Sequence, residues 1–466
     1  MRRAPVLMSL LVLLAGCSKE PETPQPPTLP EPDEAEILAM VPTDVPNTAY
    51  YKELFLDGGC ELNPGIKENG IVINGRLPYA IATAGIKTCE YFLSTVDDVD
   101  YGYIQSDQQL QTDIISGTPE DINGVLLYPD GEPRFRMMYV FGGHSGPHGK
   151  TIGVHGRHLV NIFYTNGGSY VGSCAGAYLA GRYAGGGSSH YFDIWKGGNM
   201  NATGVGNSSI DIEMVSDSFV PYFGPSINTV IKGARHNGGG YMDVDNAPPG
   251  TEIIARFLHQ KGMDSSSRSF YMQPAVWAYK ASPRSGRLVV TGSHPEDAPD
   301  GDIHKLTASM FRYGYEGSGC AKVKGVLRKG DLVPMKYGTD DNRPEYTRIG
   351  DLQCHHFVFY LNAPQTPVTL RLEGEGDYDL ELYLKKDGFA FPWDSPDYSS
   401  CTGGAIQQID TPPLSEGLWY VTVRCATTVT ATETIINPAT GKGRRFVYSG
   451  KTGVLNGVPY SISVDW

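Results

Sequence analysis

The sequence has little charge for its length, and its basic residues do not cluster. Charged residues make up 19% of its 466 residues, and 38 Lys and Arg against 51 Asp and Glu give a formal net charge of −13. Phosphate contacts require clustered Lys and Arg, so a general nucleic-acid binder is excluded. No stretch beyond Leu14 approaches the roughly 18 apolar residues of a membrane-spanning helix. A phosphate-binding G-x-x-x-x-G-K-[ST] loop is also absent from the sequence.

Apolar residues and turn formers are plentiful. Hydrophobic residues make up 40% of the chain, which is enough for packed cores, and 57 Gly and 33 Pro favour many turns over long helices. At about 150 residues per domain, the length predicts two or three domains.

The N-terminal residues resemble the signal of bacterial lipoproteins. A basic start (Met1–Arg3) precedes an apolar run (Val6–Leu14), which ends in Leu-Ala-Gly-Cys at Cys17. The resemblance implies that residues 1–16 are removed and that Cys17 is lipidated; the alternative is an ordinary signal peptide followed by a chance cysteine. We therefore expect a lipid anchor in the bacterial cell envelope, at the outer membrane on either face, with the membrane as a partner. Residues 17–45 are rich in Pro and Glu and predict an extended stalk.

The other seven cysteines are an odd number, which suits an oxidising compartment with one thiol left over. Six cysteines allow 15 connectivities. Proximity along the chain favours the three disulfides Cys60–Cys89, Cys320–Cys354 and Cys401–Cys425. Cys174 is then the remaining thiol.

The surroundings of Cys174 predict a nucleophile on a sharp turn. Residues 134–143 read as a strand running into Gly142 and Gly143, residues 151–164 could form a helix, and residues 169–172 read as a short strand. A helix is expected to start directly after it, which places Cys174 in a strand–turn–helix with the pattern G-x-C-x-G. The neighbouring Ser173 is out of register for the nucleophile, because the spacing selects Cys174.

A base follows later in the chain. The strand Leu288–Val290 ends near His294, and Glu296 lies two residues further on. The imidazole can reach the thiol and the carboxylate can orient the imidazole, as in triads of nucleophile, base and orienter.

Together, Gly172–Tyr178 and Gly292–Glu296 resemble the class I glutamine amidotransferase-like superfamily. Within it they are most similar to the family named for the N-terminal domain of biotin–protein ligases, over residues 46–316. The resemblance implies a flavodoxin-like, doubly wound α/β sheet, with Cys174 as nucleophile, His294 as base and Glu296 as its orienter. It also implies Gly143 and Ala175 as backbone oxyanion donors. Cyanophycinase-type serine peptidases share the turn, with Ser in place of Cys.

These residues predict a cysteine-nucleophile hydrolase, similar to an amidase or peptidase. We expect it to cleave amide, peptide or γ-glutamyl bonds of a small-molecule, peptide or cell-wall substrate through a thioester. The alternative is a binding protein with an inactive pocket. No cofactor is expected.

Two further segments of this region attract attention. The first holds four histidines, but Gly residues and Pro147 break any helix that would align them, so no metal site is predicted; they are His144, His148, His155 and His158. The second, residues 182–250, reads as long loops, in which Tyr191, Phe192 and Trp195 either line a groove or pack the loop. Residues 235–240 are a candidate pocket rim.

From about residue 347 the pattern alternates with period two. After a linker at 317–346, strands are expected at 356–361, 368–372, 380–384, 418–423 and 460–464, which predicts an all-β sandwich. Residues 374–380 and 417–421 resemble the bacterial pre-peptidase C-terminal domain, over 347–466. That resemblance implies an accessory or adhesive module of secreted enzymes. Asp377 and Asp379 are more typical of solvated turn residues than of calcium ligands.

Overall fold

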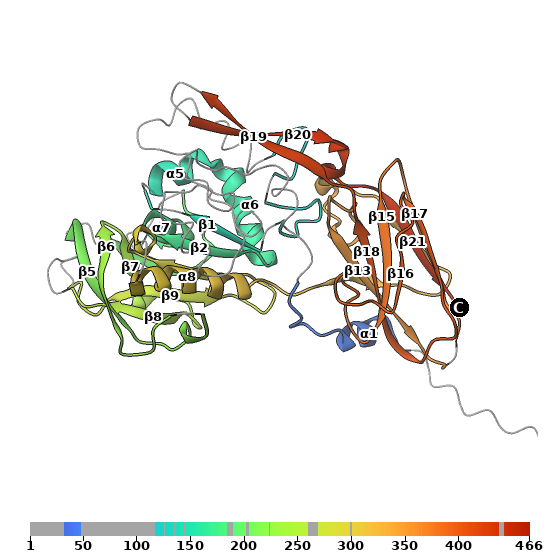
Figure 1. Ribbon diagram of the computed structural model, residues 1–466, viewed down its shortest axis with the longest axis horizontal. Coiled ribbons are helices and arrows are strands. Elements are labelled where there is room, and N and C mark those ends of the chain that lie inside the picture. The colour runs from blue at the N-terminus through green and yellow to red at the C-terminus, as the bar shows by residue number, and fades with distance from the viewer. Residues whose placement is uncertain are drawn as a thin grey trace, which may run out of the picture.

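The computed structural model describes residues 32–47 and 117–466, with short gaps at 125, 135, 141, 144, 184–189, 202–204, 223, 260–268, 299–300, 365 and 438–441. The expected signal peptide, Cys17, most of the stalk, the pair Cys60–Cys89 and His144 lie outside these residues. Figure 1 shows two units side by side, an α/β unit and a β-rich unit. Among the described helices, none combines the length and apolarity needed to cross a bilayer.

A seven-stranded sheet forms the centre of the α/β unit. Its strand order is β1-β2-β10-β9-β8-β5-β6. β1 and β10 pair in parallel with β2, whereas all the other neighbours are antiparallel. The strands are β1 (Met137–Val140), β2 (Ser169–Ser173), β5 (Asn207–Met214), β6 (Val230–Asn237), β8 (Glu252–Phe257), β9 (Pro274–Lys280) and β10 (Arg287–Thr291). The expectation of an α/β domain is confirmed. The finer expectation of a flavodoxin-like strand order remains a prediction.

Helices cover both faces of the parallel strands. On one face lie α6 (Gly153–Asn166) and α7 (Ala175–Ala180), preceded by the short α5 (Ser145–Thr151). On the other lies α8 (Gly301–Glu316), where Gly314 packs so closely that a Cβ would be 2.7 Å from Val171. β2 is buried along its whole length, so only its carboxyl end opens towards the loops.

The segment expected to form long loops at 182–250 contains strands. Besides β5 and β6 it contains β3 (Arg182–Tyr183), β4 (Gly198–Asn201) and β7 (Gly240–Met242), which form a small sheet of their own. Phe192 and Trp195 are buried in the core and Tyr191 packs against it. Of the two readings of these aromatic residues, packing is the one observed.

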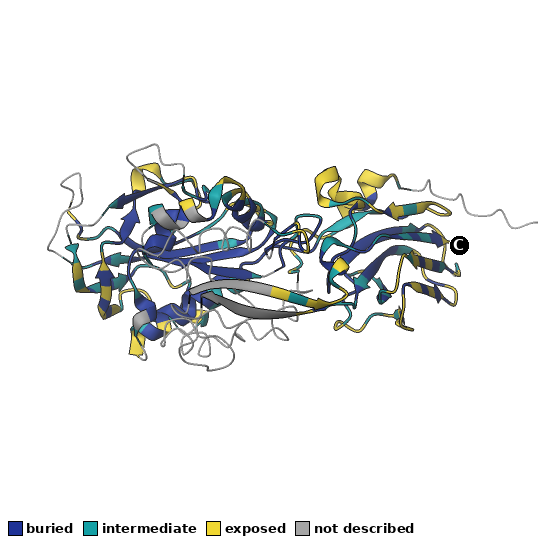
Figure 2. Cartoon of the chain, turned by 90° about the horizontal axis from the view of Figure 1, so that it is seen from above, coloured by how far each residue is buried: buried dark blue, intermediate teal, exposed yellow. Residues whose placement is uncertain are grey.

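Two sheets make up the β-rich unit. Their strand orders are β11-β13-β18-β15-β16 and β12-β21-β14-β17. Figure 2 shows buried strands in the middle of both units, with exposure concentrated at the periphery. The strands are β11 (Val323–Val326), β12 (Leu332–Met335), β13 (Cys354–Leu361), β14 (Thr369–Gly374), β15 (Leu380–Lys386), β16 (Tyr398–Ser400), β17 (Ile406–Asp410), β18 (Gly417–Cys425) and β21 (Tyr460–Asp465). A long hairpin of β19 (Val429–Asn437) and β20 (Lys442–Gly450) extends from this unit towards the α/β unit (Figure 1).

Two of the expected boundaries are wrong. The predicted linker at 317–346 supplies β11 and β12, which belong to the two sheets. The predicted stalk at 17–45 ends in a helix, α1 (Glu34–Met40), whose Ile37 is buried against the β-rich unit. Asp33 and Glu36 cap this helix reciprocally, with both hydrogen bonds at 2.9 Å.

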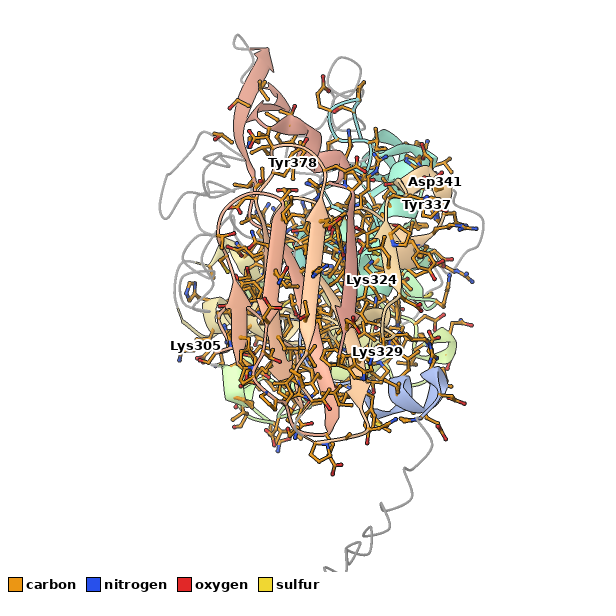
Figure 3. All side chains as sticks on the ribbon, turned by 90° about the vertical axis from the view of Figure 1, so that its right-hand side faces the viewer. Lys305, Lys324, Lys329, Tyr337, Asp341 and Tyr378 are labelled. Carbon is orange, nitrogen blue, oxygen red and sulfur yellow. The ribbon has the colours of Figure 1, made fainter. Side chains whose placement is uncertain are left out.

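Buried charges join the two units. Arg134, just before β1, pairs with Asp121 at 3.2 Å and with Asp351 of the β-rich unit at 3.1 Å. Lys324 of β11, labelled in Figure 3, pairs with Asp130. A buried guanidinium needs such partners, because an unpaired charge in the interior is strongly unfavourable.

The predicted disulfides that fall within the described residues are absent. Cys320, Cys354, Cys401 and Cys425 all carry free thiols. Cys354 lies opposite Arg424, so Cys425, one residue further along β18, faces the other side of the sheet. Cys401 is exposed, and its thiol donates a hydrogen bond to the hydroxyl of Tyr383. Tyr383 lies on the same side of the sheet as Arg424, so Cys401 and Cys425 are on opposite sides. Cys320 donates instead to the carbonyl of Pro283.

Candidate functional site

Cys174 lies on a strained turn between β2 and α7. Its φ of 49° and ψ of −103° place a non-glycine residue in a sparsely populated region. Its backbone N–H donates to the carbonyl of Thr291 at 2.8 Å, which joins the ends of the parallel neighbours β2 and β10. Strain of this kind persists only where the surrounding structure enforces it, and it is frequent at functional sites.

The two glycines of the G-x-C-x-G pattern make this turn possible. A Cβ on Gly172 would lie 2.9 Å from the backbone carbon of Gly176. A Cβ on Gly176 would overlap the carbonyl of Val140 at the end of β1. Only glycine lets the turn pack this closely, so the sequence pattern has a direct steric cause.

His294 reaches the same point from the adjacent strand. It follows β10 and precedes the short 3₁₀ turn Pro295–Asp297. Its backbone N–H donates to the carbonyl of Arg235 at 2.7 Å, and its Nδ1 lies 3.1 Å from Oε1 of Glu296. The side chains of His294 and Cys174 meet beside Gly142, where an added Cβ would overlap Cε1 of His294 and lie 3.2 Å from Cβ of Cys174. The structure therefore brings together the three residues that the sequence singled out.

The surroundings favour a protonated imidazole. Burial lowers the pKa of His294, but the hydrogen bonds to Cys174 and Glu296 outweigh it and raise the pKa to about 11. Cys174 is 5% exposed and Glu296 4% exposed, so water screens these interactions little. In general an imidazolium beside a cysteine favours the thiolate, which is the nucleophilic form.

Gly142 borders the thiol and the imidazole. A Cβ at this position would overlap Cε1 of His294 and lie 3.2 Å from Cβ of Cys174. The next residue, Gly143, has a φ of 147°, which favours glycine. On the other side, Ala175 begins α7, and Ala177 and Tyr178 donate the first helical hydrogen bonds to the carbonyl of Cys174. The oxyanion role of the Gly143 and Ala175 N–H groups remains a prediction.

The predicted pocket rim at 235–240 contacts Cys174. The Sγ of Cys174 lies 4.0 Å from the carbonyl of Asn237, and the hydroxyl of Tyr178 donates to the carbonyl of Gly238 at 3.4 Å. His236 is buried beside Ser293, and burial lowers its pKa to about 4. A neutral His236 adds no further charge to the site near neutral pH.

Sequence reasoning missed two hydroxyl groups below the site. They belong to Ser173, which donates a hydrogen bond to the carboxylate of Glu296, and to Tyr139, which contacts Ser173. The available signal was a serine within a fully buried strand, where a polar side chain requires a partner.

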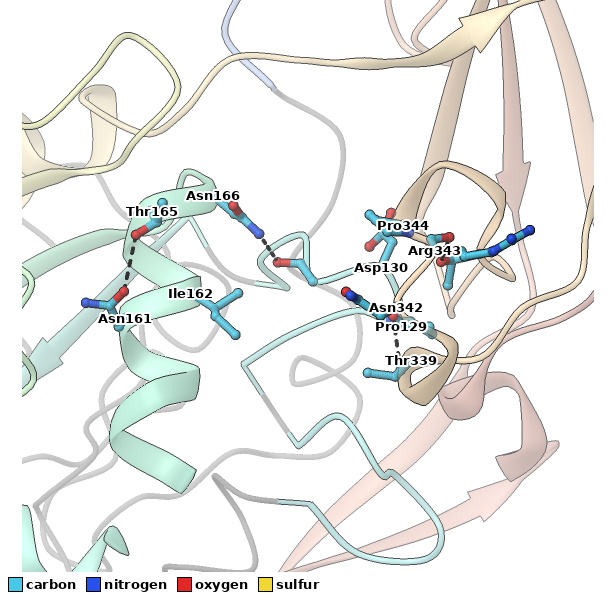
Figure 4. A pocket seen from close by; sticks show the side chains of 12 residues that line it. Pro129, Asp130, Asn161, Ile162, Thr165, Asn166, Thr339, Asn342, Arg343 and Pro344 are labelled. Carbon is cyan, nitrogen blue, oxygen red and sulfur yellow. Dashed lines mark hydrogen bonds between the residues drawn. The ribbon is translucent and has the colours of Figure 1, made fainter. Parts of the chain in front are cut away.

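Within the part of the chain that the structure describes, no three His, Cys, Asp or Glu side chains gather as a metal site would require. A cleft of about 390 Å³ lies elsewhere, between α6 and the segment 339–347 (Figure 4). Asn161, Ile162 and Thr165 line one side of it, and Thr339, Asn342 and Arg343 line the other. Cys174 and His294 do not line this cleft, so it is separate from the thiol site.

Comparison with known proteins places the chain only loosely. No family model matches it, and no curated protein matches it. A solved glutamine amidotransferase is 16% identical, with 38% of this chain and 80% of that chain covered and a TM-score of 0.27. A protein from Thermoplasma acidophilum, provisionally assigned as one component of a GMP synthase, is 14% identical over 48% of this chain and 94% of that chain, with a TM-score of 0.28.

The neighbours also include a collagenase pre-peptidase C-terminal domain from Bacillus anthracis. It is 10% identical, covers 31% of this chain and 99% of that chain, and has a TM-score of 0.19. TM-scores this low establish no shared activity. The chemistry of the site must therefore be judged from its own residues.

Proposed function

We propose that the α/β unit is a cysteine hydrolase that cleaves amide, peptide or γ-glutamyl bonds through a thioester. The observation that supports this most directly is the position of His294, whose imidazole is hydrogen-bonded to Glu296 and lies beside Cys174. Few structural roles require a strained cysteine, an imidazole and a buried carboxylate in contact.

The reaction has two steps. The Sγ of Cys174 attacks the substrate carbonyl, and His294 passes a proton to the leaving amine as the C–N bond breaks. Water, activated by His294, then attacks the thioester and frees Cys174. Backbone N–H groups of Gly143 and Ala175 are proposed to stabilise the oxyanion in both steps.

The finer family assignment is part of this proposal. The G-x-C-x-G turn and the segment from Gly292 to Glu296 support membership of the class I glutamine amidotransferase-like superfamily, near the biotin–protein ligase N-terminal domain family, with a flavodoxin-like sheet. The residues around Cys17 support a lipid anchor that holds the enzyme at the bacterial cell envelope. The β-rich unit is proposed as a pre-peptidase C-terminal-like accessory sandwich.

Alkylation of the full chain by iodoacetamide tests the thiol site. Cys401 is exposed and serves as the reference thiol in the same molecule. At about pH 6, where ordinary thiols are mostly protonated, we expect Cys174 to be labelled at least about tenfold faster than Cys401. His294→Ala and Glu296→Gln should remove this advantage, as judged by peptide mass spectrometry.

The outcomes of this experiment distinguish a cysteine hydrolase from a binding protein. If Cys174 is labelled no faster than Cys401, or if His294→Ala changes nothing, the hydrolase proposal is wrong. If Cys174 is activated, γ-glutamyl and peptidyl p-nitroanilides distinguish the bond classes, with Cys174→Ser as control. An activated thiol that turns over none of these anilides would favour the alternative, a pocket used for binding.

A further inference from the structure

Ser173 directly precedes Cys174 in the sequence, and its side chain faces the side of the sheet that α8 covers. Side chains alternate along β2, so Ser173 shares a face with Val171, the face that α8 covers. Its side chain is buried, with 1% exposure. A hydroxyl in such a place is costly unless it is hydrogen-bonded.

Its partners form a chain that ends at the thiol. The Oγ of Ser173 donates to Oε1 of Glu296 at 2.8 Å and lies 2.9 Å from the hydroxyl of Tyr139. Because the single Ser173 proton goes to the carboxylate, Tyr139 is the donor in the second bond. The same Oε1 lies 3.1 Å from Nδ1 of His294. Both hydroxyls thus act on the carboxylate oxygen that orients the base.

We infer that Ser173 and Tyr139 are positioning residues, which hold Glu296 in place and directed at His294 and so set the reactivity of Cys174. This inference rests on the proposed thiol site. Glu296 is buried, and its second oxygen, Oε2, has no hydrogen-bond partner among the described residues. The position of the carboxylate therefore depends on the hydrogen bonds that Oε1 makes.

The direction of the effect follows from this arrangement. Without the hydroxyl of Ser173, the Glu296 carboxylate is less stabilised and less firmly placed. The imidazolium of His294 then loses part of its partner, and the thiolate of Cys174 loses part of its counter-charge. The thiol should consequently react only at higher pH.

The pH profile of iodoacetamide alkylation at Cys174, measured on the full chain, tests the inference. We expect Ser173→Ala to raise the midpoint by about one pH unit or more, a roughly tenfold slower reaction below the midpoint. Tyr139→Phe keeps the ring and removes one hydroxyl, so it should shift the midpoint in the same direction by a smaller amount. Ser169→Ala is the matched control, because Ser169 is buried in the same strand but accepts from the backbone N–H of Arg287, at the end of β2 remote from Cys174.

The outcomes are distinct. A wild-type midpoint in both Ser173→Ala and Tyr139→Phe overturns the inference while leaving the hydrolase proposal intact. An equal shift in Ser169→Ala would show a general packing effect and would also overturn it. Wild-type labelling that does not depend on His294 refutes the thiol site itself, and with it any positioning role. If Ser173→Ala fails to fold, Tyr139→Phe still decides the question.

Discussion

At the scale of single residues, the candidate site depends on the absence of side chains as much as on their presence. Gly142 leaves the space that the imidazole of His294 occupies, and Gly172 and Gly176 let the Cys174 turn close. The sequence predicted the turn glycines and the three side chains that meet there, because their spacing along the chain carries the pattern. The contacts of Ser173 and Tyr139 could not be read in this way, because Glu296 meets them only after the sheet forms.

Gly142→Ala is expected to displace His294 and slow the reaction of Cys174. The added Cβ would overlap the imidazole, and a displacement of about 1 Å at a reacting centre can reduce the rate by roughly a hundredfold. Labelling by iodoacetamide at about pH 6, relative to Cys401, measures the loss.

Gly146→Ala provides the control for that change. It lies close by in α5, and the nearest atom to its added Cβ is 3.5 Å away, in the side chain of His190. It should leave the labelling of Cys174 unchanged. Wild-type labelling of Gly142→Ala would mean that the imidazole does not need its observed position.

At the scale of elements, the regular strands were predictable and the composition of some segments was misleading. The expected strands at 356–361, 380–384 and 418–423 lie within β13, β15 and β18, because alternation of apolar and polar residues is a direct consequence of the pleat. In contrast, residues 182–250 are rich in Gly, Asn and Ser, and tertiary pairing overrides that composition to form β3 to β7.

Helix α1 is a second element that the composition of its surroundings did not predict. It follows a Pro- and Glu-rich stretch, which favoured an extended stalk, yet the Asp33–Glu36 capping box was visible in the sequence. What the sequence did not reveal is the surface on which the helix packs. Ile37 is buried in a cluster with Val358 and Tyr420 of the β-rich unit.

Ile37→Ala should therefore lower stability without changing the thiol site. Removing a buried Ile side chain typically costs about 2–5 kcal/mol, and the cost is smaller where the helix can shift to fill the space. Urea unfolding of the full chain measures it. The neighbouring Leu38 is 38% exposed, so Leu38→Ala should cost much less; equal losses would show that α1 is not anchored by Ile37.

At the scale of the whole molecule, the charge network that joins the two units is expected to respond to pH. Burial raises the pKa of the Asp121 carboxyl to about 7, although the nearby guanidinium of Arg134 opposes the shift. In the folded state Asp121 thus keeps its proton up to about pH 7. In the unfolded chain the same carboxyl loses its proton near pH 4. The contribution of Asp121 to stability is greatest below pH 4 and is lost as the pH rises towards 7.

Asp121→Asn should remove this dependence. Between about pH 5 and pH 8, the free energy of unfolding of the wild type should fall relative to the variant, by at most about 1.4 kcal/mol per pH unit. Urea unfolding at both pH values measures the difference. Asp331, which is exposed, gives the control Asp331→Asn. Parallel pH dependences of wild type and Asp121→Asn would contradict a titrating Asp121.

The placement of β12 has a consequence for how the chain folds during synthesis. Leu332 of β12 pairs with Ser463 of β21, and α1 docks on strands made far later. Whether the chain emerges from a ribosome or from an export channel, β12 and the apolar face of α1 therefore appear well before their partners. Contacts this distant in sequence form slowly and leave sheet edges exposed in the meantime. The β-rich unit should accordingly be the late step of folding, and the one most dependent on chaperones.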